Sequence, residues 1–404
     1  MNGARLHRRQ FLYAGFAGLL ALTLTPRAFG NMPPVRVGLD AEFLDPTSTA
    51  CDAIEFGARR AIDDINARGG VLGGRPLQLV TTDNRSVPSR GVANAERLAA
   101  MADLTAYLCG KFSPVALEQL PHIHRLQLPL LNPWSAADTI IDNHQSPNYA
   151  FRLGLCDSIA MERLLLEIKN RKLQEVGLLV PSTAWGRSCR FFVERYIAME
   201  ASTKLTLTGV EWHRWGNDKT IEESYRTLVG RGAQAILLVA NEPEGSALVR
   251  GLAGLTESSH RPIFSHWGLT GGRFTEMCGP ALHHIELTIA QSFSFALAKG
   301  AVAARVANAA AEHFGVKDPL AVPSMTGIGP AYDLVQLLAL AIDKAGSTHR
   351  PDIQRALEHL PPHDGLVKPF PQAFTPMRHE ALDRRDVLVC QFDYRGRLVP
   401  KKKS

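Results

Sequence analysis

Residues Ala53–Val80 read AIEFGARRAIDDINARGGVLGGRPLQLV, and this stretch predicts the kind of fold that the chain adopts. Spacings of three and four between apolar residues predict a helix over residues 53–68, with one apolar face made of Ile54, Ala58, Ala61, Ile62 and Ile65. Gly69-Gly70 should end that helix, because glycine readily takes the left-handed backbone conformation found at helix ends. A turn and a strand beginning at Leu77 follow, so the stretch forms a helix–turn–strand unit.

The two glycine pairs of this stretch could also suggest a nucleotide site. Phosphate-binding loops precede a helix, whereas Gly69-Gly70 and Gly73-Gly74 follow one. We therefore interpret both pairs as turn formers.

The same alternation of strands and helices continues along the chain. Short aliphatic runs predict strands at residues 35–39, 77–82, 105–109, 176–180, 235–239, 262–265 and 387–394. Helical patterns cover residues 53–68, 89–101, 115–124, 158–170, 187–199, 220–231, 244–255, 301–313, 331–345 and 352–359. This βαβ order predicts an α/β protein with doubly wound, mostly parallel sheets, and a chain of this length suggests a pair of similar lobes.

The first 30 residues have the pattern of a signal peptide. Arg8-Arg9 precede an apolar run, Phe11–Leu24, and small residues at Ala28 and Gly30 offer a cleavage site. The run is shorter than the ~20 residues that a membrane-spanning helix needs, which disfavours a membrane anchor. Arg8-Arg9-Gln10-Phe11-Leu12 resembles a twin-arginine export signal, so we favour export after folding over ordinary Sec export.

The positive charge of the chain does not indicate a nucleic-acid partner. The net charge is +6, but the first 30 residues carry Arg5, Arg8, Arg9 and Arg27 and no acid, so the remainder is +6 − 4 = +2. Three of the remaining positive charges are in the tail, at residues 401–403. The mature chain is nearly neutral, which argues against binding to a polyanion.

Six cysteines, Cys51, Cys109, Cys156, Cys189, Cys278 and Cys390, would lie in an oxidising compartment after export. None belongs to a C-x-x-C pair, so the sequence contains no zinc or thiol redox motif of that kind. We expect buried free thiols at most of these positions and assign no disulfide pairing.

Several blocks resemble the leucine/isoleucine/valine-binding protein family, the extracytoplasmic solute receptors of branched-chain amino acid ABC importers. The block Glu55–Leu77 matches the family pattern G-A-x-x-A-x-x-x-I-N-A-x-G-G-I-x-G-x-x-L, and Ala331–Gly346 matches its Y-D-A-x-x-L-L-A-x-A-I-x-x-A-G helix. Weaker matches are Thr82–Asn84, Gly110–Ser113 and Leu128–Pro133.

The resemblance implies the type I periplasmic binding protein fold, in which two lobes joined by three chain crossings close on a ligand. The first lobe would hold residues 35–152 and 289–380, and the second residues 153–288 and 381–400, after a signal peptide of residues 1–30. The βαβ order independently places ligands at the carboxyl ends of the parallel strands.

The resemblance also implies which residues contact the ligand. In the family, a G-x-x-S turn and the segment after S-P hold an amino acid carboxylate with amides and hydroxyls, and the second lobe adds aromatic and polar residues. The matching positions here are Ser113, Trp134, Ser135, Ala136, Trp185, Asn241 and Trp267. Ser113 could instead serve only as a helix cap, and the tryptophans could instead pack in the lobe cores.

One departure from the family pattern bears on the ligand. Amino-acid receptors carry an acid for the α-ammonium group where this chain has His266-Trp267-Gly268. A buried ammonium without a carboxylate would cost several kcal/mol, so an α-amino acid is disfavoured. Asp40 or Glu42 could replace that acid, or could be solvated loop residues. Three tryptophans at predicted cleft loops suit a flat amide-like or aromatic ligand, or a cation held against the rings.

Motifs for catalysis are weak. There is no G-x-S-x-G, H-E-x-x-H or phosphate-loop pattern, and the pairs His122/His124 and His283/His284 should point in different directions. We expect no enzymatic activity, no cofactor and no metal.

The sequence therefore predicts a periplasmic solute receptor, a monomer or weak dimer, that captures a small amino acid, amide or aromatic ligand and delivers it to the membrane permease of an ABC transporter. The alternative is a periplasmic sensor that presents the ligand to a membrane signalling partner. No nucleic-acid partner is expected.

Overall fold

The computed structural model describes residues 32–43, 45–200, 204–215 and 219–401. The predicted signal peptide and its twin-arginine pattern lie outside the described residues.

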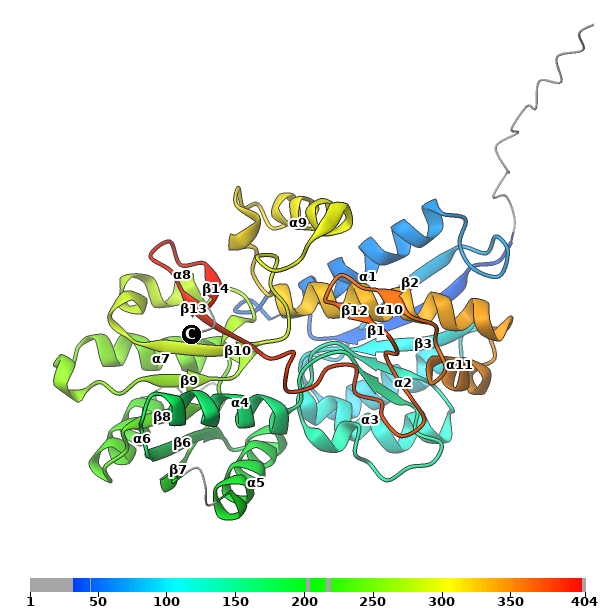
Figure 1. Cartoon of the computed structure of the whole chain (residues 1–404). Helices are drawn as coiled ribbons and strands as arrows, with labels where there is room; N and C mark the ends of the chain where they lie inside the picture. The colour runs from blue at the N-terminus through cyan, green and yellow to red at the C-terminus, as the bar shows by residue number, and fades with distance from the viewer. Residues whose placement is uncertain (1–31, 44, 201–203, 216–218, 402–404) are drawn as a thin grey trace, which may run out of the picture. The chain divides into compact units, whose positions relative to one another are not determined.

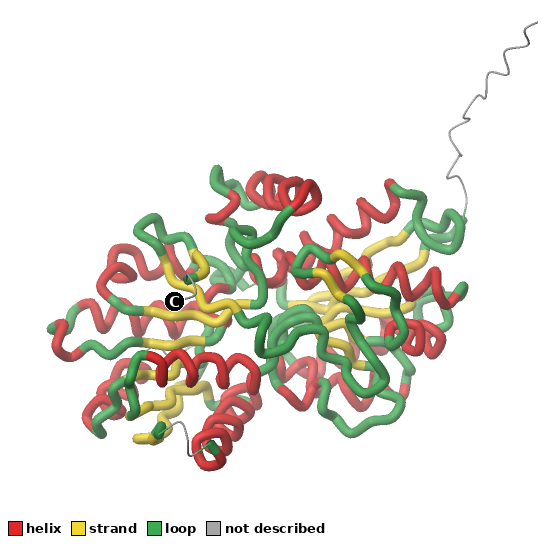
Figure 2. Tube along the Cα trace, in the orientation of Figure 1, coloured by secondary structure: helices red, strands yellow, loops and turns green. Residues whose placement is uncertain are grey.

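The strands form two large sheets, which Figures 1 and 2 show side by side. The first is a five-stranded parallel sheet in the order β2-β1-β3-β4-β5. Its strands are β1 (Val35–Ala41), β2 (Leu77–Asp83), β3 (Leu104–Cys109), β4 (Leu130–Asn132) and β5 (Ala150–Arg152). We call this sheet and the helices packed on it the first lobe.

The second sheet has seven strands in the order β14-β13-β10-β9-β8-β6-β7. Five are parallel: β6 (Glu175–Pro181), β7 (Thr206–His213), β8 (Ala235–Leu238), β9 (Ile263–Ser265) and β10 (Leu287–Gln291). The hairpin β13 (Leu388–Phe392) and β14 (Leu398–Pro400) returns antiparallel to β10. This sheet and its helices are the second lobe, and β11 (His363–Asp364) pairs with β12 (Pro369–Phe370) apart from both sheets.

Helices cover both sheets, as the βαβ order predicts. Those of the first lobe are α1 (Ala50–Ala67), α2 (Pro88–Ala99), α3 (Ser113–Arg125), α10 (Met325–Ala345) and α11 (Arg350–Leu357). Those of the second lobe are α4 (Asp157–Asn170), α5 (Ala184–Met199), α6 (Lys219–Gly230), α7 (Glu242–Ala253) and α8 (Phe274–Cys278). Helix α9 (Gly300–His313) stands beside α1 and contacts it through Phe56 and His313.

The stretch that predicts the fold adopts the expected structure. The five apolar residues of the predicted face of α1 are all buried. Gly69 and Gly70 have φ of 112° and 71°, and the amide of Gly70 donates to the Ile65 carbonyl, which closes the helix. A Cβ at Gly70 would collide with the Arg75 carbonyl oxygen, so the turn requires glycine there.

Helix α10 is the most apolar helix of the first lobe. It is 21 residues long and, by length and composition alone, apolar enough to cross a membrane, but almost all of it is buried inside the protein. It begins at Met325, six residues before the predicted start, and continues through Pro330. Most of its surface packs inside the protein, which outweighs the local cost of the proline.

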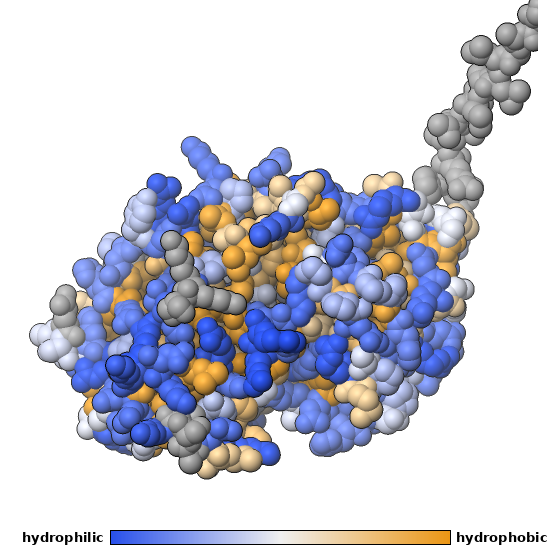
Figure 3. All heavy atoms as spheres, viewed as in Figure 1, coloured by the Kyte–Doolittle hydropathy of each residue, from blue (hydrophilic) through white to orange (hydrophobic). Residues whose placement is uncertain are grey.

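One face of the molecule is drawn with all its heavy atoms in Figure 3. The face drawn in Figure 3 is mostly hydrophilic, with hydrophobic residues scattered among the polar ones.

Candidate functional site

A small cavity lies where loops from the two lobes meet. The first lobe contributes the turn after β3 and the segment after β4, and the second contributes the loops after β7, β8 and β9 and the start of α5. The lining residues are Lys111, Phe112, Ser113, Pro114, Trp134, Ala136, Trp185, Trp215, Asn241, His266 and Gly268. Ligands of α/β proteins bind in this position, beyond the carboxyl ends of parallel strands.

Ser113 fixes the first-lobe side of the cavity. It is the first residue of α3, and its Oγ accepts hydrogen bonds from the amides of Ala136 (3.1 Å) and Ala137 (3.2 Å). The side chain therefore joins two ligand-side loops and does not cap its own helix, which excludes the alternative of a simple cap. Its hydroxyl hydrogen remains available to a ligand, because both amides act as donors.

Lys111 brings the positive charge to the cavity. Its buried Nζ donates to Asp45 Oδ2 at 2.9 Å and lies 3.9 Å from Glu242 Oε2 of the second lobe. Burial alone would lower the pKa of Lys111, but the negative charges of Glu242 and Asp45 outweigh burial and raise it, so the side chain stays protonated. The ammonium also lies 5.2 Å from the centre of the Phe112 ring.

Glu242 connects the lobes as well. Its Oε1 accepts a 2.7 Å hydrogen bond from Ser48 Oγ, in the segment that leads into α1. The Thr49 amide donates to the Gly271 carbonyl at 2.6 Å, beside this contact. Burial raises the pKa of Glu242, while Lys111 and Ser48 oppose the rise. The structure thus shows the lobes in direct polar contact at the edge of the cavity.

Asp157 positions the aromatic wall of the second lobe. Trp185 Nε1 donates to Asp157 Oδ1 at 3.0 Å, and the Asp157 amide donates to the Ala136 carbonyl of the first lobe at 2.9 Å. His266 lies beside this pair, with Nε2 at 3.5 Å from Asp157 Oδ1, and its Nδ1 accepts from the Gly268 amide at 3.2 Å. Burial lowers the pKa of His266, which keeps the imidazole neutral.

The structure brings five of the seven predicted residues to the cavity, namely Ser113, Trp134, Ala136, Trp185 and Asn241. Ser135 and Trp267 are fully buried outside the lining. Ser135 Oγ donates to the Gly110 carbonyl at 2.9 Å, and the Trp267 ring stacks behind His266 with 3.3 Å between the ring centres.

Sequence reasoning missed several lining residues. Lys111 and Phe112 lie within the Gly110–Ser113 turn that resembles the family, and His266 lies within the His266–Gly268 segment. Their position beside predicted site residues was the only signal that could have identified them. Trp215, which follows β7, had no local signal, because no strand was predicted there.

Asp40 and Glu42 are neither partners of a ligand cation at the cavity nor solvated loop acids. Both are buried, so they are not solvated loop acids, and neither lines the cavity. Asp40 accepts from Thr82, Asn84, Asn94 and Gln119, and Glu42 accepts from the Lys111 amide and the Cys51 thiol. Both carboxylates organise the loops behind the site.

Within the described part of the chain, no group of three or more His, Cys, Asp or Glu residues could hold a metal ion. All six cysteines are buried free thiols. The site therefore consists of aromatic rings, one lysine and a few hydrogen-bonding groups.

Comparisons with known proteins identify the family of the chain. A sequence profile of the family described as "Periplasmic binding protein" matches residues 34–386. The Leu/Ile/Val-binding protein BraC3 of Rhizobium johnstonii is 23% identical over 332 residues, covering 81% of this chain and 83% of that protein.

Solved structures share the fold. A periplasmic binding protein type 1 from Bordetella pertussis Tohama I is similar with a TM-score of 0.79 and 19% identity, covering 91% of this chain and all of that one (100%). A solute-binding protein of an ABC transporter from R. palustris, in complex with benzoate, is similar with a TM-score of 0.75 and 14% identity. The match covers 91% of this chain and 95% of that one. The chain belongs to the periplasmic binding protein family, with the two-lobed type I fold.

Proposed function

We propose that this protein is the extracytoplasmic solute receptor of a branched-chain amino acid type ABC importer, exported to the periplasm by its amino-terminal segment. The observation that carries the proposal is a cavity whose walls come from both lobes, because closure of two lobes around such a cavity encloses a solute. The sequence places the crossings between the lobes near residues 152, 289 and 380, and because β10 (Leu287–Gln291) belongs to the second sheet, the middle crossing would follow that strand. A membrane permease would recognise the closed form. A monomer or weak dimer suffices for this role.

A sensor would need the same cavity, but the transport role has more support. The related proteins are described as a Leu/Ile/Val-binding protein and as solute-binding proteins of ABC transporters, which favours delivery to a permease over signalling.

We propose further that the ligand is a small aromatic carboxylate. Three tryptophans and Phe112 line the cavity, and these rings suit a flat apolar body. The lysine ammonium has three N–H donors, and Asp45 accepts one of them in a hydrogen bond, so Lys111 can still receive a carboxylate. The hydroxyl of Ser113 would add a further donor.

An α-amino acid is the second candidate, since related structures hold isoleucine or leucine. The lining residues of the described chain include no carboxylate that could pair with an α-ammonium group. Two second-lobe acids lie behind the lining, and both are already engaged: Glu242 accepts from Ser48 and faces Lys111, and Asp157 accepts from Trp185. This chemistry favours the aromatic carboxylate.

A thermal-shift and calorimetry series on the purified mature protein tests both proposals. The probes are benzoate, benzamide without the charge, cyclohexanecarboxylate without the aromatic ring, L-leucine with an ammonium group, and benzyltrimethylammonium as an aromatic cation. A ligand at 100 times its Kd should stabilise the fold by about 2.7 kcal/mol. We expect benzoate to give the largest rise in melting temperature.

Lys111→Gln should remove most of the benzoate response, while Lys169→Gln, on the outer part of α4, should retain it. A rise with leucine and none with benzoate would overturn the ligand assignment but leave the receptor role. No response to any of a broad set of solutes would count against the receptor role.

A further inference from the structure

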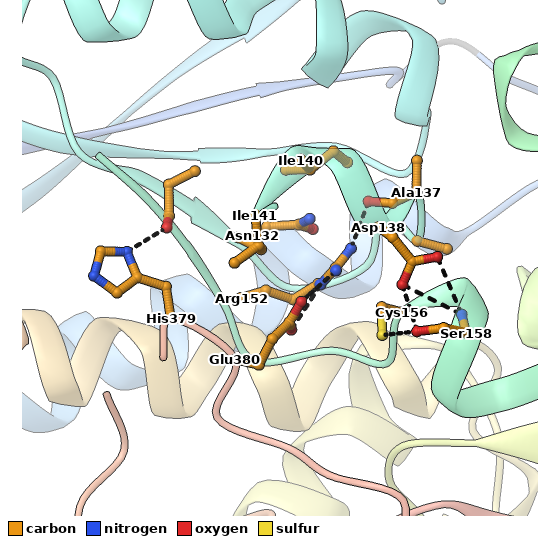
Figure 4. A network of polar contacts seen from close by, with 12 residues as sticks. Asn132, Ala137, Asp138, Ile140, Ile141, Arg152, Cys156, Ser158, His379 and Glu380 are labelled. Carbon is orange, nitrogen blue, oxygen red and sulfur yellow. Dashed lines mark hydrogen bonds and ion pairs between the residues drawn. The ribbon is translucent and has the colours of Figure 1, made fainter. Parts of the chain in front are cut away.

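Arg152, at the end of β5, is a fully buried cation (Figure 4). It lies behind the loop of residues 133–138, which follows β4 and which we call the ligand-side loop. Its Nε and Nη2 donate to the carboxylate of Glu380, with Nε 2.9 Å from Oε2. Its Nη1 donates to the carbonyl oxygens of Ser135 and Ala137, both at 3.0 Å. One guanidinium therefore joins a carboxylate and two backbone carbonyls.

The two carbonyls lie on either side of Ala136, a residue of the cavity lining. The Ala136 amide donates to Oγ of Ser113, another lining residue, while the Ala136 carbonyl accepts from the Asp157 amide. Arg152 thus holds the backbone that presents the ligand-side amides, although Arg152 itself does not line the cavity.

Glu380 belongs to the last segment that passes between the lobes. The Arg152 amide donates to the His379 carbonyl at 2.8 Å, and the Ala381 amide donates back to the Arg152 carbonyl at 2.9 Å. The His379 ring stacks on Phe151 with 4.0 Å between the ring centres, and its Nδ1 donates to the Ala150 carbonyl. The last crossing is therefore paired with β5, directly beneath the ligand-side loop.

The first crossing is tied to the same loop. Asp138, just after Ala137, accepts from the Ser158 amide and hydroxyl of α4, as Figure 4 shows. Two of the interlobe crossings therefore meet at one short loop, and the guanidinium lies between the loop and the last crossing.

A buried ion pair is a costly way to hold a fold together, since apolar residues of similar size often stabilise a core as well. The five N–H donors of an arginine instead give directional control of several acceptors at once. We propose that Arg152 is a positioning residue for ligand binding, which orients the loop at Ala136 and links that loop through Glu380 to the last crossing between the lobes.

The test compares Arg152→Lys and Glu380→Gln with the matched control Arg350→Lys. Arg350 is a partly buried arginine of the first lobe that, like Arg152, donates to backbone carbonyls, those of Leu104 and Ala99, but in the described structure it makes no hydrogen bond to the ligand-side loop. The first readout needs no ligand and is amide hydrogen exchange of a peptide covering residues 133–138, with a β1 peptide as the internal reference.

Arg152→Lys should speed exchange in the loop peptide by about tenfold or more, because a lysine cannot hold both carbonyls and the carboxylate. Glu380→Gln keeps the guanidinium and should give a smaller effect in the same direction. Arg350→Lys should leave the loop unchanged. An unchanged exchange rate of the loop peptide in a folded Arg152→Lys or Glu380→Gln protein overturns the proposal. An equal rise in the exchange rates of the loop peptide and the β1 peptide also overturns it.

The second readout, which rests on the proposed function, is the affinity for benzoate at a temperature where all variants are folded. We expect about tenfold weaker binding for Arg152→Lys and no change for Arg350→Lys. If the wild type does not bind benzoate, the ligand proposal fails, and the exchange result alone decides the positioning role. Faster loop exchange with unchanged benzoate affinity would show that the loop order does not govern binding and would overturn the proposal.

Discussion

The hydrogen bond between Ser48 of the first lobe and Glu242 of the second should stabilise the closed arrangement of the two lobes without stabilising either lobe by itself. Ser48→Ala removes the hydroxyl whose one hydrogen is within reach of Glu242 Oε1 (2.7 Å) and of the Gly271 carbonyl (2.8 Å), two acceptors of the second lobe. Hydrogen bonds to charged groups contribute about 1.5–3 kcal/mol, and each 1.4 kcal/mol is a tenfold change in an equilibrium constant. The partly buried site places the expected effect at the lower end, so ligand affinity should fall about tenfold.

Titration calorimetry of the wild type, Ser48→Ala and Thr47→Ala with the best solute measures this effect. Thr47 is the matched control, because its hydroxyl donates to Asp45 within the same loop and, among the described residues, makes no hydrogen bond to the second lobe. Melting temperatures without ligand should stay similar, since both lobes keep their cores. Equal affinities for Ser48→Ala and wild type, or equal losses in both variants, would refute the idea that this contact stabilises the closed form.

Three further predictions concern other parts of the molecule. Trp185→Ala should weaken benzoate binding at least tenfold, while Trp185→Phe, which keeps a ring but loses the bond to Asp157, should retain more affinity in calorimetry; full affinity in the alanine variant would disprove an aromatic wall. Burial raises the pKa of Asp333 from 3.8 to about 7, so the folded state holds this proton where the unfolded chain has lost it. Urea unfolding should show that stability falls as pH rises from about 4 to about 7, and Asp333→Asn should flatten that trend; an identical trend in both proteins would contradict the raised pKa. Gly57→Ala should destabilise the first lobe by about 1–3 kcal/mol in thermal unfolding, because its Cβ would collide with the Ile328 carbonyl of α10; an unchanged melting temperature would contradict that close packing.

Much of the fold could be predicted because its signals are local. The apolar face of α1 and the glycines after it follow from spacing alone. Strand β7 was missed because it is an edge strand with only partly buried residues, so it carries no continuous apolar run. The start of α10 was placed too late, because packing around Pro330 is a tertiary effect.

The site was predictable to the level of loops but not of side chains. The cavity uses the loops at the strand ends, as topology requires. The local backbone conformation decides which of two adjacent residues lines the cavity. Ala136 lines the cavity, while the Ser135 hydroxyl donates to the Gly110 carbonyl. His266 lines the cavity, while Trp267 packs behind His266. Asp157 had no sequence signal, since its role arises from Trp185, which lies far along the chain.

The aromatic lining gives this protein an optical property. The chain has five tryptophans, and three of them, Trp134, Trp185 and Trp215, line the cavity. Indole emission depends on the polarity around the ring, so a solute that displaces water from the cavity should change the intrinsic fluorescence of the whole protein. The receptor thus carries its own label-free reporter of occupancy, and an emission scan could identify its solute before any other assay.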